Sequence, residues 1–309
     1  MQMRLIRIYL LMLGSIGLIG CSGDESSERD GRPPVVATTP VVADLAVQVA
    51  GDRVEVRQML APNADPHEYE PRPSDAAAVA DADVVLRSGG DLDEWMDELV
   101  ESSGSDAEVV DLIASITPIE GSGDDAGEPD PHWWHDPRNA IAAVRAIREA
   151  LISADPEGRA RYTRNAAAYG DELTRLDRSI EACMARIPTG QRKLVTTHDS
   201  LGYFARRYDV ELIGSVIPSL STEGQPSAGD TAALIDQVER EGVKVVFAES
   251  SVSSKVEEAI AREADARVGD ELWADSLGPA GSGGETYVAA LEANADALAR
   301  GFTDGEVSC

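Results

Sequence analysis

The 309-residue chain is poor in basic residues and rich in acidic ones. Its 27 Lys and Arg stand against 56 Asp and Glu, which gives a formal net charge of −29. That charge repels a phosphate backbone and argues against a nucleic-acid role. Because the acidic residues are spread along the chain, we interpret them as a strongly hydrated surface rather than one binding face. The length and the 43% hydrophobic content suffice for two hydrophobic cores.

Apolar runs long enough to cross a membrane are absent, and the most pronounced run lies at the N-terminus. Arg4 and Arg7 precede residues 8–20, which are too short for an ordinary membrane span but suit a signal peptide. Leu18-Ile19-Gly20-Cys21 resembles the bacterial lipoprotein box. It predicts a signal peptide of residues 1–20, lipidation of Cys21, and a lipid anchor on the outer face of the cell membrane, at the cell surface or in the periplasm. A plain secretory signal with an incidental Cys21 is the alternative.

Cysteine is scarce, with three residues in the chain. If Cys21 is lipidated, Cys183 and Cys309 remain in an oxidising compartment, which favours a disulfide between them. Cys309 is the last residue given, however, and a disordered end with two free thiols fits the sequence equally well. Residues 21–34 have no hydrophobic periodicity and predict a flexible tether.

Strands and helices alternate in two series, which predicts an α/β fold with parallel-rich sheets flanked by helices. Residues 35–155 make up the first predicted lobe and residues 188–309 the second. Between them, residues 156–187 carry apolar side chains at three- and four-residue intervals. They predict one connecting helix on the order of 45 Å long. Residues 120–130 contain glycines and acids but few apolar residues, and we expect a mobile surface loop there.

The four histidines occupy positions that suit a metal site. His67 and His198 each follow a predicted strand, and ligands of α/β sheets bind at the carboxyl ends of strands. The segment Asp130–Pro137 places His132 and His135 beside two tryptophans and two carboxylates. Neutral imidazoles suit a borderline metal, carboxylates can orient them, and tryptophans can exclude water. Each histidine taken singly is more often a packed or surface residue than a ligand, so the prediction depends on their convergence.

A fourth donor should be a carboxylate from the second lobe. Asp275, in a predicted loop between a strand and a helix, is the best candidate, although an Asp there is also typical of a helix cap. Glu249 lies at a predicted strand end. We interpret it as an acceptor that orients a ligand, and a surface carboxylate is the alternative.

Several motifs in this order resemble the cluster A-I substrate-binding lipoproteins of bacterial ABC transporters for zinc and manganese. The resemblance covers Val35 to about Arg300 and is carried by VVATTPVVADLAVQVAGDRV, PNADPHEYEPRPSD, DPHWWHDPRNA, VTTHDSLGYFARRY, VVFAESSVSSK and LWADSLG. It implies two pseudo-symmetric lobes joined by one long rigid helix. A divalent metal in the interlobe cleft would be bound by His67, His132, His198 and Asp275.

The chain departs from the family pattern at two places. His135 stands where the family usually has a residue that is not a ligand, so it either competes with His132 for the metal or is only its neighbour. The family's histidine-rich loop is replaced by a short acidic segment, in which Asp124, Asp125 and Glu128 offer at most weak cation attraction.

The resemblance implies a non-enzymatic, monomeric protein that captures metal and delivers it to a membrane ABC permease. Manganese members carry a carboxylate where this chain has His198, so three imidazoles and one carboxylate favour zinc (Zn²⁺) over manganese (Mn²⁺). Binding should weaken below about pH 6.5, where ordinary imidazoles protonate. The alternatives are a manganese-specific member, an adhesin role, and a zinc hydrolase with Glu68 or Glu249 as base, although the chain has no HExxH motif.

Overall fold

The computed structural model describes residues 32–309, which form one compact unit. The predicted signal peptide, the proposed lipidation site Cys21 and most of the tether lie outside the described residues. Within the described part of the chain, no helix is both long and apolar enough to cross a bilayer.

The first lobe is built on a parallel four-stranded sheet of order β2-β1-β3-β4. Its strand residues alternate between two cores, as period-two side-chain geometry requires. Val35 and Val84 face one hydrophobic cluster, whereas Val36 and Val85 face another on the opposite side. The strands are β1 (Pro34–Ala37), β2 (Glu55–Gln58), β3 (Val84–Arg87) and β4 (Glu108–Asp111).

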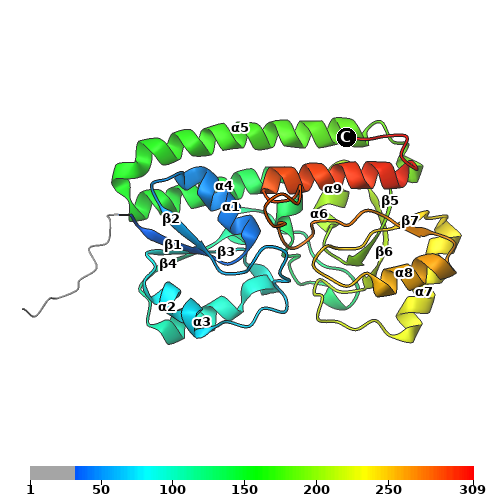
Figure 1. Ribbon diagram of the computed structural model, residues 1–309, viewed down its shortest axis with the longest axis horizontal. Coiled ribbons are helices and arrows are strands. Elements are labelled where there is room, and N and C mark those ends of the chain that lie inside the picture. The colour runs from blue at the N-terminus through cyan, green and yellow to red at the C-terminus, as the bar shows by residue number, and fades with distance from the viewer. Residues whose placement is uncertain (1–31) are drawn as a thin grey trace, which may run out of the picture. The chain divides into compact units, whose positions relative to one another are not determined.

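Helices cover both faces of this sheet (Figure 1). Two of them pack on the face of Val35, and the other two pack against each other on the face of Val36. Proline begins three of the four helices, a position where its missing N–H leaves no hydrogen bond unmade. The first pair is α1 (Pro40–Ala50) and α4 (Pro137–Ala154), and the second is α2 (Pro73–Ala80) and α3 (Trp95–Ser103).

The second lobe repeats the alternation with shorter strands. β5 (Lys193–His198) pairs in parallel with β6 (Glu211–Ile217), and β7 (Val245–Val246) pairs in parallel with β8 (Arg267–Val268). The Phe247 N–H donates to the Val195 carbonyl over 2.9 Å, which places the two pairs side by side. The helices of this lobe are α6 (Gly202–Tyr208), α7 (Ala228–Glu241), α8 (Lys255–Glu263) and α9 (Tyr287–Phe302).

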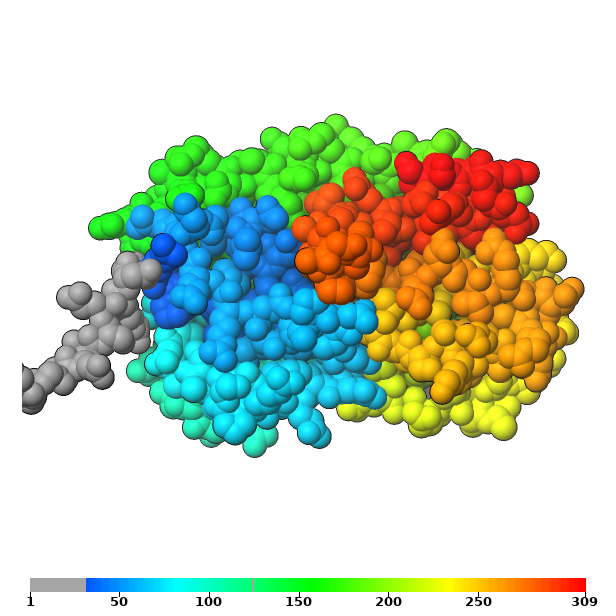
Figure 2. All heavy atoms as spheres, viewed as in Figure 1, coloured from blue at the N-terminus to red at the C-terminus, as the bar shows by residue number. Residues whose placement is uncertain are grey.

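Helix α5 (Arg159–Met184) joins the lobes and, at 26 residues, is the longest helix described. Its length is about 39 Å at 1.5 Å per residue. It packs on α1 and α4 of the first lobe and on α6 and α9 of the second. In Figure 2 the first lobe lies directly against the second on the face shown, and α5 runs along both. The two lobes therefore share one continuous support.

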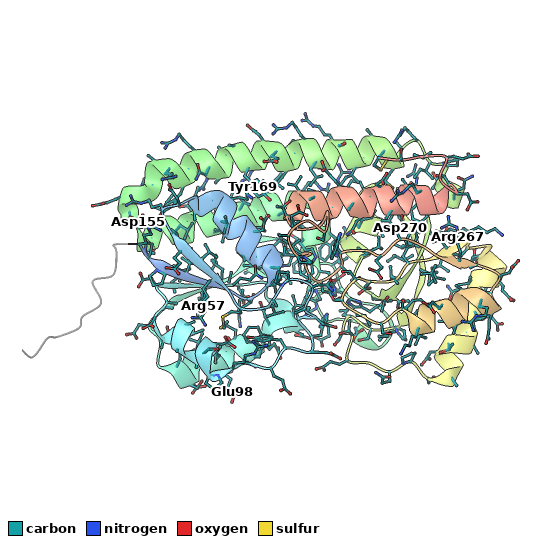
Figure 3. All side chains as sticks on the ribbon, in the orientation of Figure 1. Arg57, Glu98, Asp155, Tyr169, Arg267 and Asp270 are labelled. Carbon is teal, nitrogen blue, oxygen red and sulfur yellow. A yellow bond between two sulfur atoms is a disulfide. The ribbon has the colours of Figure 1, made fainter. Side chains whose placement is uncertain are left out.

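The start of the connecting segment differs from expectation. Residues 156–158 form a separate 3-10 turn ahead of α5. The Asp155 side chain accepts hydrogen bonds from the Tyr162 hydroxyl, over 2.6 Å, and from Arg53. Figure 3 labels Asp155 at this corner and Tyr169 further along α5. The acid fixes the corner between α4 and α5, so the helix starts three residues later than predicted.

Residues 120–130, expected to be a mobile loop, are folded. Gly121 N–H donates to the Glu128 carbonyl over 2.9 Å, and a 3-10 turn lies between them. The Asp125 carboxylate accepts the Leu220 N–H over 2.8 Å, which ties the segment to the second lobe. The expectation failed because these hydrogen bonds, rather than apolar burial, order the segment.

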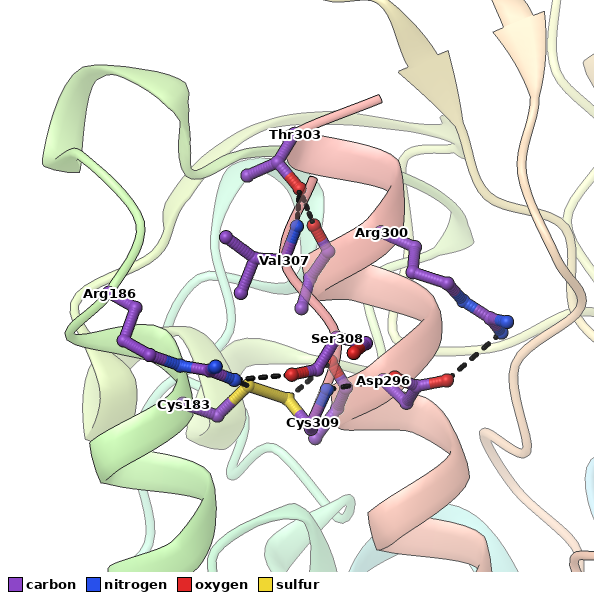
Figure 4. The surroundings of a disulfide bond; sticks show 10 residues. Cys183, Arg186, Asp296, Arg300, Thr303, Val307, Ser308 and Cys309 are labelled. Atoms are coloured by element: carbon purple, nitrogen blue, oxygen red, sulfur yellow. Dashed lines mark hydrogen bonds and ion pairs between the residues drawn. A yellow bond between two sulfur atoms is a disulfide. The ribbon is translucent and has the colours of Figure 1, made fainter. Parts of the chain in front are cut away.

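A disulfide joins Cys183, near the end of α5, to Cys309 (Figure 4). The segment after α9 is also held by polar contacts. Cys309 N–H donates to Asp296 over 2.8 Å, and Arg186 donates to the Ser308 carbonyl. These contacts attach the end of the second lobe to the connecting helix.

We expect Cys309→Ser to lower the free energy of unfolding by about 3 kcal/mol, because the crosslink closes a long loop in the unfolded chain. The sequence separation of the two cysteines is 126 residues. Thermal unfolding should fall by roughly 5–10 °C. Cys183→Ser should match it, and reductant should destabilise only the unsubstituted protein; equal melting of oxidised protein and variant would contradict the prediction.

Candidate metal centre

The structure brings four of the predicted site residues to one point. Each of His67, His132, His198 and Asp275 offers one nitrogen or oxygen, and these atoms all lie within 4.8 Å of one another. The side chains of the last three are fully buried, and that of His67 is 6% exposed. Residues that lie up to 208 positions apart in the chain therefore meet in the interior between the lobes.

The spacing of the four donors fits a tetrahedral ion. Nε2 of His198 lies 3.2 Å from Nε2 of His132 and 3.2 Å from Oδ2 of Asp275. Asp275 lies 3.4 Å from His132 and 3.6 Å from His67. Ligands at the corners of a tetrahedron with bonds of about 2.0–2.2 Å lie about 3.3–3.6 Å apart. The cluster has the dimensions of a four-coordinate metal site.

Several of these donor atoms have no other use within the protein. Nε2 of His67 and both carboxylate oxygens of Asp275 are buried without a hydrogen-bond partner. A buried polar atom that lacks a partner is costly unless something else satisfies it. A cation at the centre of the cluster would satisfy all of them. Asp275 caps no helix, since α9 is capped by Thr286.

His132 is oriented by Asp130, two residues before it. The Asp130 Oδ1 accepts both the His132 backbone N–H, over 2.9 Å, and its Nδ1–H, over 2.8 Å. This fixes the tautomer and leaves the lone pair of Nε2 facing the cluster. The tryptophans pack around the ligand: Trp133 bonds to Ser88, and the ring of Trp134 lies 5.4 Å from that of His132. Asp136, the other flanking acid, caps α4 instead.

Glu249 orients His198 in the same way. Nδ1 of His198 lies 2.9 and 2.8 Å from the two carboxylate oxygens of Glu249, and the His198 backbone N–H donates to one of them over 3.2 Å. His198 ends β5, and Glu249 follows β7 on the neighbouring strand. The parallel strands therefore deliver the imidazole and its acceptor to the same edge.

The Asp275 loop is held from both lobes. The Trp134 indole N–H donates to the Ala274 carbonyl over 2.9 Å, so the residue two positions after His132 fixes the residue before Asp275. Asn294 of α9 bonds to both backbone groups of Trp273, over 2.8 and 2.7 Å. These contacts aim the carboxylate without binding it.

The electrostatics of the cluster are set by burial and by the carboxylates. Burial lowers the pKa of His67 to about 2 and that of His132 well below its usual value, so both imidazoles are neutral. Burial alone would lower the pKa of His198, but Glu249 and Asp275 outweigh it and raise the pKa to about 10. Burial raises the pKa of Asp275 to about 8, although His198 opposes the rise. The metal-free cluster therefore retains a proton at neutral pH.

His135 is buried next to the cluster but does not belong to it. Both of its ring nitrogens lack a hydrogen-bond partner, and its ring packs against Trp134 with the centroids 5.6 Å apart. Burial lowers its pKa well below the usual imidazole value. Of the two roles left open by the sequence, the structure places His135 as a neighbour.

A cavity of about 330 Å³ opens beside His67. It is bounded by both lobes, and its rim is acidic. No Lys or Arg is ion-paired with these carboxylates in the described part of the chain. The acidic rim residues are Asp91, Glu94, Asp125, Glu128 and Glu223. This opening presents negative charge to a cation that approaches the cluster. A larger cavity of about 480 Å³, between the 119–122 segment and α7, contacts Asp130 but none of the four donors.

Comparison with known proteins agrees with this geometry. Residues 35–301 match the ZnuA family, described as zinc-uptake complex component A, periplasmic. The chain belongs to this family. It is 31% identical over 299 residues to the manganese-binding lipoprotein MntA of Halalkalibacterium halodurans, covering 96% of this chain and 97% of that one. It is 32% identical over 269 residues to the iron-binding protein YfeA of Yersinia pestis, covering 87% and 86%.

A solved structure has the same architecture. The periplasmic zinc-binding protein TroA of Treponema pallidum superposes with a TM-score of 0.82 at 29% identity, covering 88% of this chain and 99% of that one. The predicted α/β fold with a long helix between lobes is therefore confirmed. The chain is an extracytoplasmic substrate-binding protein of an ABC transporter for a divalent metal, and its functional partner is the transporter's permease. Because such proteins are solute carriers and not enzymes, the hydrolase alternative is excluded.

Some residues that shape the cluster were missed or only partly anticipated from the sequence. Asp65 and Thr222 were not singled out, and Asp130 was recognised only as one of two flanking acids. A signal for two of them exists, because Asp-Pro-His occurs both at residues 65–67 and at residues 130–132. An Asp commonly accepts the N–H two residues on, which predicts a turn that holds each histidine.

Glu249→Gln tests the orienting contact to His198. Loss of an oriented, charged acceptor behind a ligand should weaken metal binding by about 10- to 100-fold. Glu257→Gln is a matched control, because Glu257 is equally buried and bonds to Thr197 over 2.6 Å without contacting a donor. Competitive titration should show the control within about twofold of the unsubstituted protein; an equal loss in both variants would refute a specific role for Glu249.

Proposed function

We propose that this protein captures zinc at His67, His132, His198 and Asp275 and delivers it to the permease. The observation that carries the proposal is the donor set itself, with three imidazole nitrogens and one carboxylate oxygen spaced for bonds of about 2 Å. Nitrogen donors and four-coordinate geometry suit zinc, whereas manganese prefers oxygen donors and more ligands.

Manganese is the second candidate, and the similarity to a protein named manganese-binding supports it. The deciding position is His198, where the manganese branch of the family carries a carboxylate. In this chain the imidazole at that position is oriented by Glu249, so it is built to present Nε2 to the ion. This favours zinc.

The protein is further proposed to act as a monomer, anchored by lipid on Cys21 at the outer face of the membrane. A tether from Cys21 to Pro34 would let the folded lobes reach the permease while remaining at the membrane surface. The predicted domain boundaries, with lobes at residues 35–155 and 188–309, belong to the same proposal.

Selectivity should be tested by competitive titration of zinc and manganese on the unsubstituted protein and His198→Glu. We expect one tight zinc per chain and much weaker manganese binding. The substitution should shift the preference towards manganese by at least about tenfold, because it replaces a nitrogen donor with an oxygen donor. Failure to bind stoichiometric zinc, or equal selectivity in both proteins, would overturn the assignment.

Zinc binding should release protons and strengthen with pH. Since the metal-free His198 and Asp275 have raised pKa values, about 10 and about 8, they hold a proton that the ion must displace. Apparent affinity should therefore fall as pH falls through the whole range below about 8. This onset lies above the value of about 6.5 expected from an ordinary imidazole.

Calorimetry in two buffers of different ionisation enthalpy measures this release. We expect about one proton per zinc at pH 7 and roughly tenfold weaker binding for each pH unit lost between pH 8 and 6. Equal heats in both buffers, together with constant affinity, would contradict a proton-bearing cluster.

A further inference from the structure

The loop that presents His67 is fastened to the second lobe by a single side chain. Asp65 uses its two carboxylate oxygens for different partners. Oδ1 accepts the His67 backbone N–H over 2.9 Å, and Oδ2 accepts the Thr222 hydroxyl over 2.7 Å. Thr222 lies between β6 and α7 of the second lobe and is only 6% exposed. Asp65 therefore links the position of a metal donor to the opposite lobe.

The other Asp-Pro-His turn shows that this link is not required for holding a histidine. At Asp130, one carboxylate oxygen accepts both the backbone N–H and the Nδ1–H of His132, and the contact stays within a single turn. The same tripeptide at residues 65–67 directs its second oxygen across the lobe boundary instead. The contact to Thr222 is thus an addition to the turn.

The two sides of the boundary carry the two halves of the metal cluster. His67 and His132 come from the first lobe, and His198 and Asp275 come from the second. A bound ion and the Asp65–Thr222 hydrogen bond would therefore cross the same boundary in parallel. Asp65 is also close enough to the cluster to raise the pKa of Asp275, so its charge is felt by the ion as well.

We propose that the Asp65–Thr222 hydrogen bond is a latch that closes the His67 loop over the bound ion and slows its release. The proposal rests on the proposed function, because it assumes that His67 is a ligand. Asp65 and Thr222 are positioning residues: neither is one of the four donors. The latch retards dissociation, since the first lobe cannot withdraw His67 from the ion while the hydrogen bond holds.

Thr222→Val tests the latch, because it removes the hydroxyl and keeps the side-chain shape. Zinc release into excess chromogenic chelator, followed by stopped flow, should become roughly tenfold faster, the effect of losing one hydrogen bond to a charged group. The association rate should stay within about twofold. Thr222→Ser, which retains a hydroxyl, should restore slow release, a result that general destabilisation would not give.

Thr303→Val is the matched control. Thr303 is also buried and donates to the Ala299 carbonyl over 2.7 Å, but it lies at the end of α9 beside the disulfide (Figure 4). Its loss should lower stability without changing release. If Thr222→Val does not fold, Thr222→Ala replaces it, with thermal unfolding of the metal-free protein as the check.

Unchanged release in Thr222→Val, equal acceleration in Thr303→Val, or fast release in Thr222→Ser would each overturn the latch. These outcomes differ from failure of the proposed function, in which the unsubstituted protein would not bind stoichiometric zinc. Asp65→Asn separates charge from geometry, because an amide can still bond to the Thr222 hydroxyl and the His67 N–H. It should release zinc more slowly than Asp65→Ala, and equal rates in these two variants would also count against the latch.

Discussion

The structure depends on the convergence of four donor atoms in a buried space that no protein group satisfies. Both oxygens of Asp275 and Nε2 of His67 lack hydrogen-bond partners, and two of the imidazoles are nearly fixed by carboxylates behind them. Each of these atoms is unfavourable where it lies unless a cation is present. The surrounding contacts resist their separation: Trp134 and Asn294 fix the Asp275 loop, and Asp130 and Glu249 fix the rings. The protein has thus built the coordination polyhedron before the ion arrives.

The proton of the metal-free cluster complements this arrangement. Four donors that face each other at 3.2–3.6 Å would repel one another through their lone pairs if all were deprotonated. A proton on the coupled pair of His198 and Asp275 relieves part of that repulsion and occupies the place of the ion. Exchange of a proton for a metal therefore leaves the shape of the site nearly unchanged, and affinity becomes a competition between the two cations.

Much of the site could be predicted because its parts are local. His67 and His198 follow strands whose alternating or apolar sequences are easily recognised, and the edge of a parallel sheet places their side chains together. Segment 120–130 was misjudged because its order comes from glycine-permitted turns and one contact to Leu220, neither of which leaves a hydrophobic pattern. The link between Asp65 and Thr222 joins residues 157 positions apart, and nothing in either local sequence indicates it. His135 was ambiguous because a motif position does not reveal the direction of a side chain.

Helix α5 limits how the two halves of the site can part. Its 26 residues form an unbroken ladder of backbone hydrogen bonds that packs on α1 and α4 at one end and on α6 and α9 at the other. To swing the lobes wide apart, the chain would have to break hydrogen bonds along one side of that helix or strip its buried stripe from one lobe. Neither is needed to free an ion, because the segments that carry His67, Thr222 and Asp275 are loops. Discharge of the cargo is then a matter of a few ångströms of loop displacement on a rigid frame, and a permease needs only to grip those loops.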